Sequence, residues 1–125
     1  MEENNYNFDE FTDYKGKFAP RISIGQNGGF GFSSGFMNKY NLSDYHFLKI
    51  FFDREHLAIG FKFFKTSEPA TAKLRNSGVG GYFKSNSFWG KYNFDFLNYV
   101  GRYTPKEIDN NGEKMYVIDL KEVTK

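Results

Sequence analysis

Residues 28–45, GGFGFSSGFMNKYNLSDY, are the most informative segment of the chain, because they align without a gap with residues 80–97, GGYFKSNSFWGKYNFDFL. The two stretches lie 52 residues apart, and seven of their eighteen positions are identical. Three further pairs are chemically similar: Phe30 with Tyr82, Ser34 with Asn86, and Leu42 with Phe94. Two small units that cannot bury their own apolar faces can stabilise each other by packing about an approximate two-fold axis. The repeat therefore predicts one domain built from two similar units.

The first unit has the pattern of two hairpins around a short helix. The expected elements are strands at 21–24 and 30–32, a helix at 35–40, and strands at 46–52 and 57–64. Residues 21–24 alternate polar and apolar side chains as a half-buried strand does, and the glycines of 25–29 suit a tight turn. Ser33 or Ser34 is placed to cap the helix by accepting a hydrogen bond from its first free amides.

The second unit repeats this order after a polar linker at residues 66–69, which ends in Pro69. The expected elements are strands at 72–76 and 80–84, a helix at 85–92, and strands at 97–103 and 114–121. A longer loop at 105–112 is expected in the last hairpin, where the first unit has a tight turn at 53–56. Each unit is therefore predicted to be ββαββ.

Together these elements predict a mainly β fold with two short helices, in which two duplicated ββαββ units form a β-barrel-like domain with pseudo-two-fold symmetry. The domain is expected to span residues 18–125, with repeats at 18–65 and 70–122. Residues 1–17 are polar and lack sustained periodicity, so we expect a flexible arm. The first fourteen residues of this arm carry five acidic side chains and no basic one.

Composition argues against several classes of protein. The absence of cysteine excludes thiolate catalysis and cysteine-ligated metals and fits a cytoplasmic location, and no apolar run is long enough to suggest a membrane partner. His46 and His56 are the only histidines, and their neighbours Asp44, Asp53 and Glu55 are typical of exposed turns. We therefore expect no metal or other cofactor. The serines lie at predicted helix caps with no base beside them, so an enzyme is not expected.

Charge is distributed unevenly along the chain, although the net charge is only +2. Residues 57–92 carry six basic side chains against the single acid Glu68. A basic block of this kind is typical of a phosphate-binding surface, and scattered basic residues on a solvated sheet face give the same composition.

The order of strand, glycine-containing turn, strand, short helix with a Tyr-Asn-Leu stop and two more strands resembles the SpoVT/AbrB-like swapped-hairpin family. Residues 21–32, 33–42 and 46–52 carry the resemblance. Two such units in one chain resemble the duplicated arrangement of MraZ-type proteins. The family commonly opens the helix with proline, where this chain has Ser33 and Ser34, and the Asp-x-x-x-Arg motif of MraZ repeats is absent. The resemblance implies DNA binding, as in a small transcription regulator, by a basic face built from the first hairpins of both units.

On this interpretation the DNA-binding residues form two sets. The phosphate contacts would be Lys17, Arg21, Lys73, Arg75 and Lys84. The residues placed to reach base edges from the turns are Gln26, Asn27 and Asn76. Amide side chains offer a donor and an acceptor together, which suits base recognition, and they also satisfy turn geometry without any ligand.

The alternative function is a protein–protein interaction module with no nucleic-acid activity, such as an accessory protein of a phage or mobile element. Aromatic residues make up 21% of the chain, and several lie in the acidic arm. This alternative predicts an exposed apolar patch that binds a protein partner or forms a homo-oligomer. Phe88 and Trp89 are expected in the core, whereas an exposed Trp89 would favour base stacking on single strands.

Overall fold

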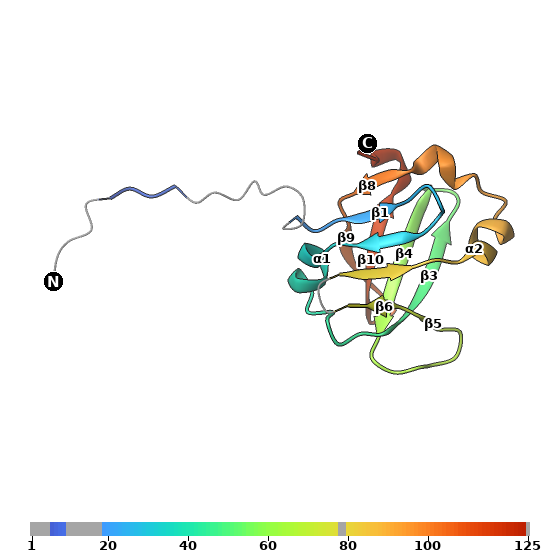
Figure 1. Ribbon diagram of the computed structural model, residues 1–125, viewed down its shortest axis with the longest axis horizontal. Helices are drawn as coiled ribbons and strands as arrows, with labels where there is room; N and C mark the ends of the chain where they lie inside the picture. The colour runs from blue at the N-terminus through green and yellow to red at the C-terminus, as the bar shows by residue number, and fades with distance from the viewer. Residues whose placement is uncertain (1–5, 10–18, 78–79, 125) are drawn as a thin grey trace.

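Figure 1 shows the computed structural model, which describes residues 6–9, 19–77 and 80–124. These residues form ten strands in two five-stranded antiparallel sheets, as expected for a mainly β fold with two short helices. The strand order of sheet A is β6 (Arg75–Asn76), β7 (Gly81–Phe83), β2 (Phe30–Phe32), β1 (Ile22–Ile24) and β8 (Gly101–Tyr103). The strand order of sheet B is β5 (Ala72–Lys73), β3 (Phe47–Asp53), β4 (Ala58–Phe64), β10 (Glu113–Asp119) and β9 (Lys106–Asn110).

The two sheets pack face to face and keep their own edge strands, so the expected barrel-like closure is wrong. The edges are β6 and β8 in sheet A, and β5 and β9 in sheet B. A barrel would require strands at these edges to pair with one another. Here the core is instead covered by two separate layers.

Both helices form as the sequence predicts and lie at opposite ends of sheet A (Figure 1). The helical elements are α1 (Ser34–Lys39), α2 (Asn86–Lys91) and the short 3₁₀ turns η2 (Phe96–Tyr99) and η3 (Leu120–Glu122). The hydroxyl oxygens of Ser33 and Ser85 accept hydrogen bonds from the amides three residues later, at 3.1 and 3.2 Å. Asn41 and Asn93 follow the two helices with φ of 55° and 49°, a conformation that asparagine tolerates and that ends a helix.

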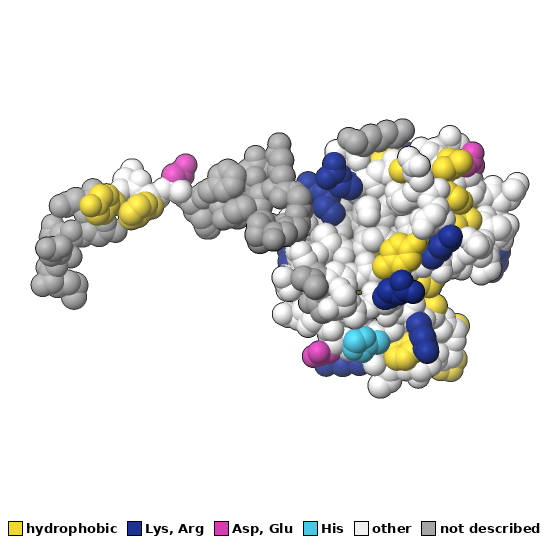
Figure 2. All heavy atoms as spheres, in the orientation of Figure 1, with side chains coloured by type: hydrophobic (Ala, Val, Ile, Leu, Met, Phe, Trp, Pro, Cys, Tyr) yellow, Lys and Arg dark blue, Asp and Glu magenta, His cyan; other side chains and the backbone are white. Residues whose placement is uncertain are grey.

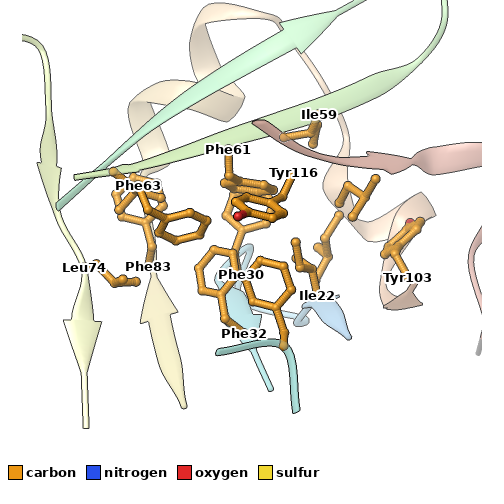
Figure 3. Close-up of a cluster of buried hydrophobic side chains, with 14 of the residues drawn as sticks. Ile22, Phe30, Phe32, Ile59, Phe61, Phe63, Leu74, Phe83, Tyr103 and Tyr116 are labelled. Carbon is orange, nitrogen blue, oxygen red and sulfur yellow. The ribbon is translucent and has the colours of Figure 1, made fainter. Parts of the chain in front are cut away.

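The core between the sheets is mostly aromatic. Figure 3 shows Phe30 and Phe32 of β2 pointing toward Phe61 and Phe63 of β4. The ring centroids of Phe30 and Phe61 are 5.1 Å apart with the planes at 73°, and those of Phe32 and Phe61 are 5.2 Å apart at 88°. Edge-to-face packing of this kind is the preferred geometry for aromatic pairs. Phenylalanine therefore fills here the volume that aliphatic residues fill in many β cores.

Phe88 and Trp89 of α2 are buried in this core, as expected. The indole Nε1–H of Trp89 donates a hydrogen bond of 2.8 Å to the carbonyl of Gly28. This bond satisfies the polar group of the buried ring and holds α2 against the β1–β2 turn. The structure therefore gives no support to base stacking by Trp89.

The strand expected at residues 72–76 is broken in two at Leu74. Lys73 of β5 pairs with Phe47 at the edge of sheet B, whereas Arg75 of β6 pairs with Tyr82 at the edge of sheet A. The side chain of Leu74 between them is 4% exposed, and its amide donates to the carbonyl of His46. Burial of Leu74 between the layers therefore turns the chain from one sheet to the other.

The last hairpin also differs from the expectation. The predicted loop at 105–112 contains strand β9, and β9 pairs with β10 through a turn at Asn111 and Gly112, whose φ values are 53° and 82°. Asn-Gly is the preferred sequence for such a two-residue hairpin turn. Of the strand predicted at 97–103, only β8 forms, and it pairs with β1 rather than with β10.

Ahead of the body, Tyr6 and Phe8 of the arm are 76% and 81% exposed, with their ring centroids 5.5 Å apart. Most of the predicted arm, including Lys17, lies outside the described residues. No helix in the described ranges combines the length and the apolar character needed to cross a membrane.

Candidate nucleic-acid interface

One row of residues crosses the outer face of sheet A from edge to edge. The paired positions run from Arg75 in β6 to Tyr82, Gly31, Ser23 and finally Arg102 in β8. Most neighbours of these residues along the strands are buried, namely Ile22, Ile24, Phe30, Phe32, Leu74, Phe83 and Tyr103, and the remaining neighbours Asn76, Gly81 and Gly101 are partly buried. Because side chains alternate along a strand, the row points away from the core.

Two shallow depressions lie along this row, one on each side of Tyr82. The larger, of about 420 Å³, is lined by Lys73, Leu74, Arg75, Tyr82, Phe83 and Lys84. The other, of about 270 Å³, is lined by Arg21, Ser23, Gly31, Phe32, Ser33, Gly81 and Arg102. We call the five cations of these two depressions, Arg21, Lys73, Arg75, Lys84 and Arg102, the basic face.

The basic face holds positive charge without a compensating carboxylate. No aspartate or glutamate lines either depression, and none of the five cations forms an ion pair with a carboxylate in the part of the chain that the structure describes. Four of the five are exposed, and Arg21 is half-buried with its guanidinium 3.4 Å from the hydroxyl of Thr104. Figure 2 looks onto this side, where Lys and Arg side chains spread over the surface and carboxylates lie at its margin.

The side chain of Tyr82 is held against the β1–β2 turn in the middle of this face. A Cβ atom at Gly29 would lie only 2.2 Å from the Tyr82 hydroxyl oxygen and 2.6 Å from its Cζ atom, so the phenol ring occupies the space that a side chain would need. The Asn27 amide nitrogen donates a hydrogen bond of 2.9 Å to that hydroxyl, and the Asn27 amide oxygen accepts one of 2.9 Å from the amide of Gly29. The β1–β2 turn therefore fixes the position of a half-buried ring between the two basic depressions.

Four of the residues predicted for phosphate contact lie together on the basic face: Arg21, Lys73, Arg75 and Lys84. Of the residues predicted to reach base edges, Gln26 is exposed at the tip of the turn, and Asn27 holds Tyr82. Asn76 lies elsewhere, because its amide nitrogen is within 2.8–3.1 Å of the carbonyl oxygens of Leu42, Ser43 and Tyr45. Asn76 therefore ties the loop after α1 to the edge of sheet A.

Sequence reasoning missed two residues of this surface, Arg102 and Tyr82. Arg102 joins the face because β8 pairs with β1, a partner that no local pattern identifies. Tyr82 was aligned with Phe30, yet Phe30 is buried whereas Tyr82 points outward. A one-residue slip in register turns every side chain of a strand to the opposite face. The order Tyr82, Phe83, Lys84 is the signal that could have placed Tyr82 outside, because residues two apart on a strand share a face and a lysine is expected on the solvent side.

The outer face of sheet B has a mostly apolar depression instead. A depression of about 300 Å³ is lined by Phe51, Phe52, Asp53, Ala58, Gly60, Ile108, Asn110, Met115 and Val117. Phe51 and Ile108 are 37% and 42% exposed. Lys62 crosses this side of the sheet, but its Nζ lies 3.1 Å from Glu113 and 3.3 Å from the carbonyl of Asn110, and the residue is 5% exposed. Lys62 therefore has a structural role and adds little positive charge to the surface.

The β3–β4 turn brings together the exposed side chains of Asp53, Glu55 and His56. The Asp53 carboxylate lies 2.7 Å from His56 Nδ1. This hydrogen bond lowers the pKa of Asp53 and raises the pKa of His56. The pair is accounted for by the turn, because Asp53 also accepts a hydrogen bond from the amide of His56.

No family model, no curated protein and no solved structure matches the chain. The resemblance to the swapped-hairpin family thus stays a prediction.

Proposed function

We propose that this protein binds nucleic acid through the basic face of sheet A. The observation that carries the proposal is the gathering of five cations around two neighbouring depressions, with no carboxylate lining either depression and no ion pair to any of the five among the described residues. The phosphates of a nucleic acid suit such a surface, because each cation that contacts them releases a counterion condensed on the polymer.

The dimensions of the face support a polymer rather than a single small anion. Arg75 and Arg102 stand at opposite edges of a five-stranded sheet, four strand spacings or about 19 Å apart. The cations divide between the two depressions, with Lys73, Arg75 and Lys84 on one side of Tyr82 and Arg21 with Arg102 on the other. A single phosphate cannot contact both groups, whereas a chain of phosphates that crosses the sheet can.

The proposal is tested by fluorescence anisotropy of labelled DNA titrated with protein over a range of salt concentrations. Binding should weaken log-linearly with salt, with a slope of up to about −3.5 if all five cations contact a single strand. The variants Arg75→Ala and Arg102→Ala should each weaken binding and reduce the magnitude of the slope by about one contact.

Matched controls come from sheet B, whose outer side carries Lys49 and Lys106. The variants Lys49→Ala and Lys106→Ala remove the same charge from the molecule and should leave the affinity within about two-fold. Equal losses in both sets would mean that net charge rather than the basic face attracts DNA. Absence of binding at low salt would overturn the proposal.

We also infer that the chain arose by duplication of a ββαββ unit. Support comes from the order of the sheets, in which hairpin β1–β2 lies beside hairpin β7–β6 and hairpin β3–β4 lies beside hairpin β10–β9. The two helices add to it with matching serine caps and matching asparagines at their ends. Strands β5 and β8, which extend one edge of each sheet, fall outside this pattern.

A second candidate function, protein–protein interaction, is favoured by the apolar outer face of sheet B. Exposed Phe51 and Ile108 border a depression lined mostly by apolar side chains. Such a surface is typical of the contact area of a protein partner. The variant Ile108→Asp should abolish concentration-dependent self-association in analytical ultracentrifugation if the partner is a second copy, and an unchanged monomer at all concentrations would count against that partner.

A further inference from the structure

We propose that the nucleic acid bound by the basic face is single-stranded and that one of its bases stacks on Tyr82. This inference rests on the proposed function and specifies its ligand. Three features carry it: the shape of the face, the fixed position of the ring, and the distribution of cations around it.

The shape of the face suits an unpaired strand. Base edges in a duplex are reached by a helix or a ribbon that enters a groove. The middle of sheet A instead presents small residues, with Gly29 against the Tyr82 ring, Gly31 paired with Tyr82 and Ser23 on the next strand, and the helices lie at the ends of the sheet (Figure 1). Unpaired bases can lie flat on such a sheet, where an aromatic side chain supplies the stacking surface.

The ring of Tyr82 is fixed before any ligand arrives. Gly29 supports it from below, and the hydrogen bond from Asn27 holds its hydroxyl. A ring that is already in place loses little conformational entropy when a base stacks on it.

The cations lie where the backbone of a stacked strand would pass. Lys73, Arg75 and Lys84 line the depression on one side of Tyr82, and Arg21 and Arg102 line the depression on the other side. Phosphates on both sides of a stacked base therefore find positive charge. Stacking supplies contact with the base, while the cations supply attraction that does not depend on sequence.

The test compares three probes against the full chain: labelled oligo(dT), its duplex with oligo(dA), and inorganic polyphosphate as a competitor without bases. The single strand should bind more tightly than the duplex. The variant Tyr82→Leu should weaken oligo(dT) binding by roughly 5- to 140-fold, the range expected for loss of one stacked base. Polyphosphate affinity should not change, because phosphates do not stack.

Two further variants test the inference even if Tyr82→Leu disturbs folding. Tyr82→Phe keeps the ring and loses only the hydroxyl bond, so oligo(dT) affinity should stay within about three-fold. Gly29→Ala keeps the ring but forces it off its support, since the new methyl group would overlap the phenol. Its matched control is Gly90→Ala in α2, where an added Cβ meets nothing within 4 Å. Only Gly29→Ala should weaken oligo(dT) binding.

The outcomes separate this inference from the proposed function. Tighter binding of the single strand, with a loss in Tyr82→Leu that polyphosphate does not share, supports both. Salt-dependent binding in which the duplex is equal or tighter, or in which Tyr82→Leu has no effect, overturns the stacking inference and leaves the basic face in place. Failure of all three probes to bind at low salt overturns both.

Discussion

The outer faces of the two sheets carry opposite chemistry although they cover the same aromatic core. On sheet A the exposed row runs from Arg75 to Arg102 over small residues, and its cations have no carboxylate partner among the described residues. On sheet B the corresponding surface is made by Phe51, Ile108 and their apolar neighbours. Its central cation, Lys62, is buried and paired with Glu113.

This difference separates a cation that stabilises the fold from one that is available to a ligand. A lysine buried among apolar groups needs a hydrogen-bonding or charged partner, because an unpaired ammonium group does not regain the hydration free energy that it loses on burial. Cations that remain solvated and unpaired contribute little to stability, and their charge stays available to a ligand. Composition alone cannot make this distinction, since Lys62 and Lys84 belong to the same basic block of sequence.

The largest effect on stability is expected in the aromatic core that the two sheets share. Phe30 is fully buried, and its ring lies 5.1 Å from that of Phe61 in the opposite sheet and 5.3 Å from that of Trp89. Phe30→Ala should lower the free energy of unfolding by about 3–5 kcal/mol, because it removes contacts of both sheets at once. Urea unfolding measures the change, and a loss below about 1 kcal/mol would show that the sheets do not share one core.

A smaller effect should separate the cations of the two faces. Glu113→Ala removes the carboxylate partner of buried Lys62 and should cost about 1–2 kcal/mol of unfolding free energy, since Glu113 itself is half-exposed. Arg75→Ala on the basic face should change stability by no more than about 0.5 kcal/mol. Urea unfolding of both variants checks the contrast, which fails if the two losses are equal.

Alkaline pH should act on both sheets through one buried tyrosine in each. Burial raises the pKa of Tyr103 in β8 to about 12, and burial with the neighbouring charge of Glu107 raises the pKa of Tyr116 in β10. A raised tyrosine pKa favours the neutral folded form, so its contribution is complete below about pH 10 and declines as pH rises toward 12.

Tyr103→Phe removes the sheet A part of this alkaline dependence and should leave that of Tyr116. Thermal unfolding measured between neutral and alkaline pH, for the natural chain and the variant, gives the comparison. An identical decline in both proteins would show that Tyr103 does not titrate in this range.

The smallest expected effect concerns the acidic arm. Deleting residues 1–14 removes five negative charges and no positive one. If the basic face binds a polyanion, the deletion should raise affinity by about two- to five-fold at low salt, and this gain should vanish as salt screens the charges. Unchanged affinity would show that the arm does not compete with the ligand.

Local patterns in the sequence predicted the local structure well. The hairpin of β1 and β2, both serine-capped helices and the β3–β4 hairpin lie within a residue or two of their expected positions. Alternation, capping and turn residues act over a few positions, so a single sequence contains the information they need. The missed β9 belongs to the same class, because Asn111 and Gly112 are a hairpin signal that the longer-loop prediction overlooked.

Long-range pairing could not be predicted in the same way. Short strands carry too little pattern to choose a partner, so the strand predicted at 97–103 was paired with the strand at 114–121 instead of with β1, and Arg102 was missed. The break at Leu74 arises because that side chain is buried between layers, which is a tertiary effect. The outward position of Tyr82 depends on a register that an ungapped alignment hides. The candidate site was therefore only partly predictable, through Arg21, Lys73, Arg75 and Lys84.

The strand order also governs how the chain reaches its native state. Sheet A is completed when Ile22 pairs with Tyr103, and sheet B when Phe61 pairs with Tyr116. Pairings so far apart in sequence must close long loops before they gain contacts, which slows folding. During synthesis, the first two hairpins and α1 emerge with their aromatic side chains uncovered. The free edges of β1, β2 and β4 stay unpaired until their partners β8, β7 and β10 have left the ribosome.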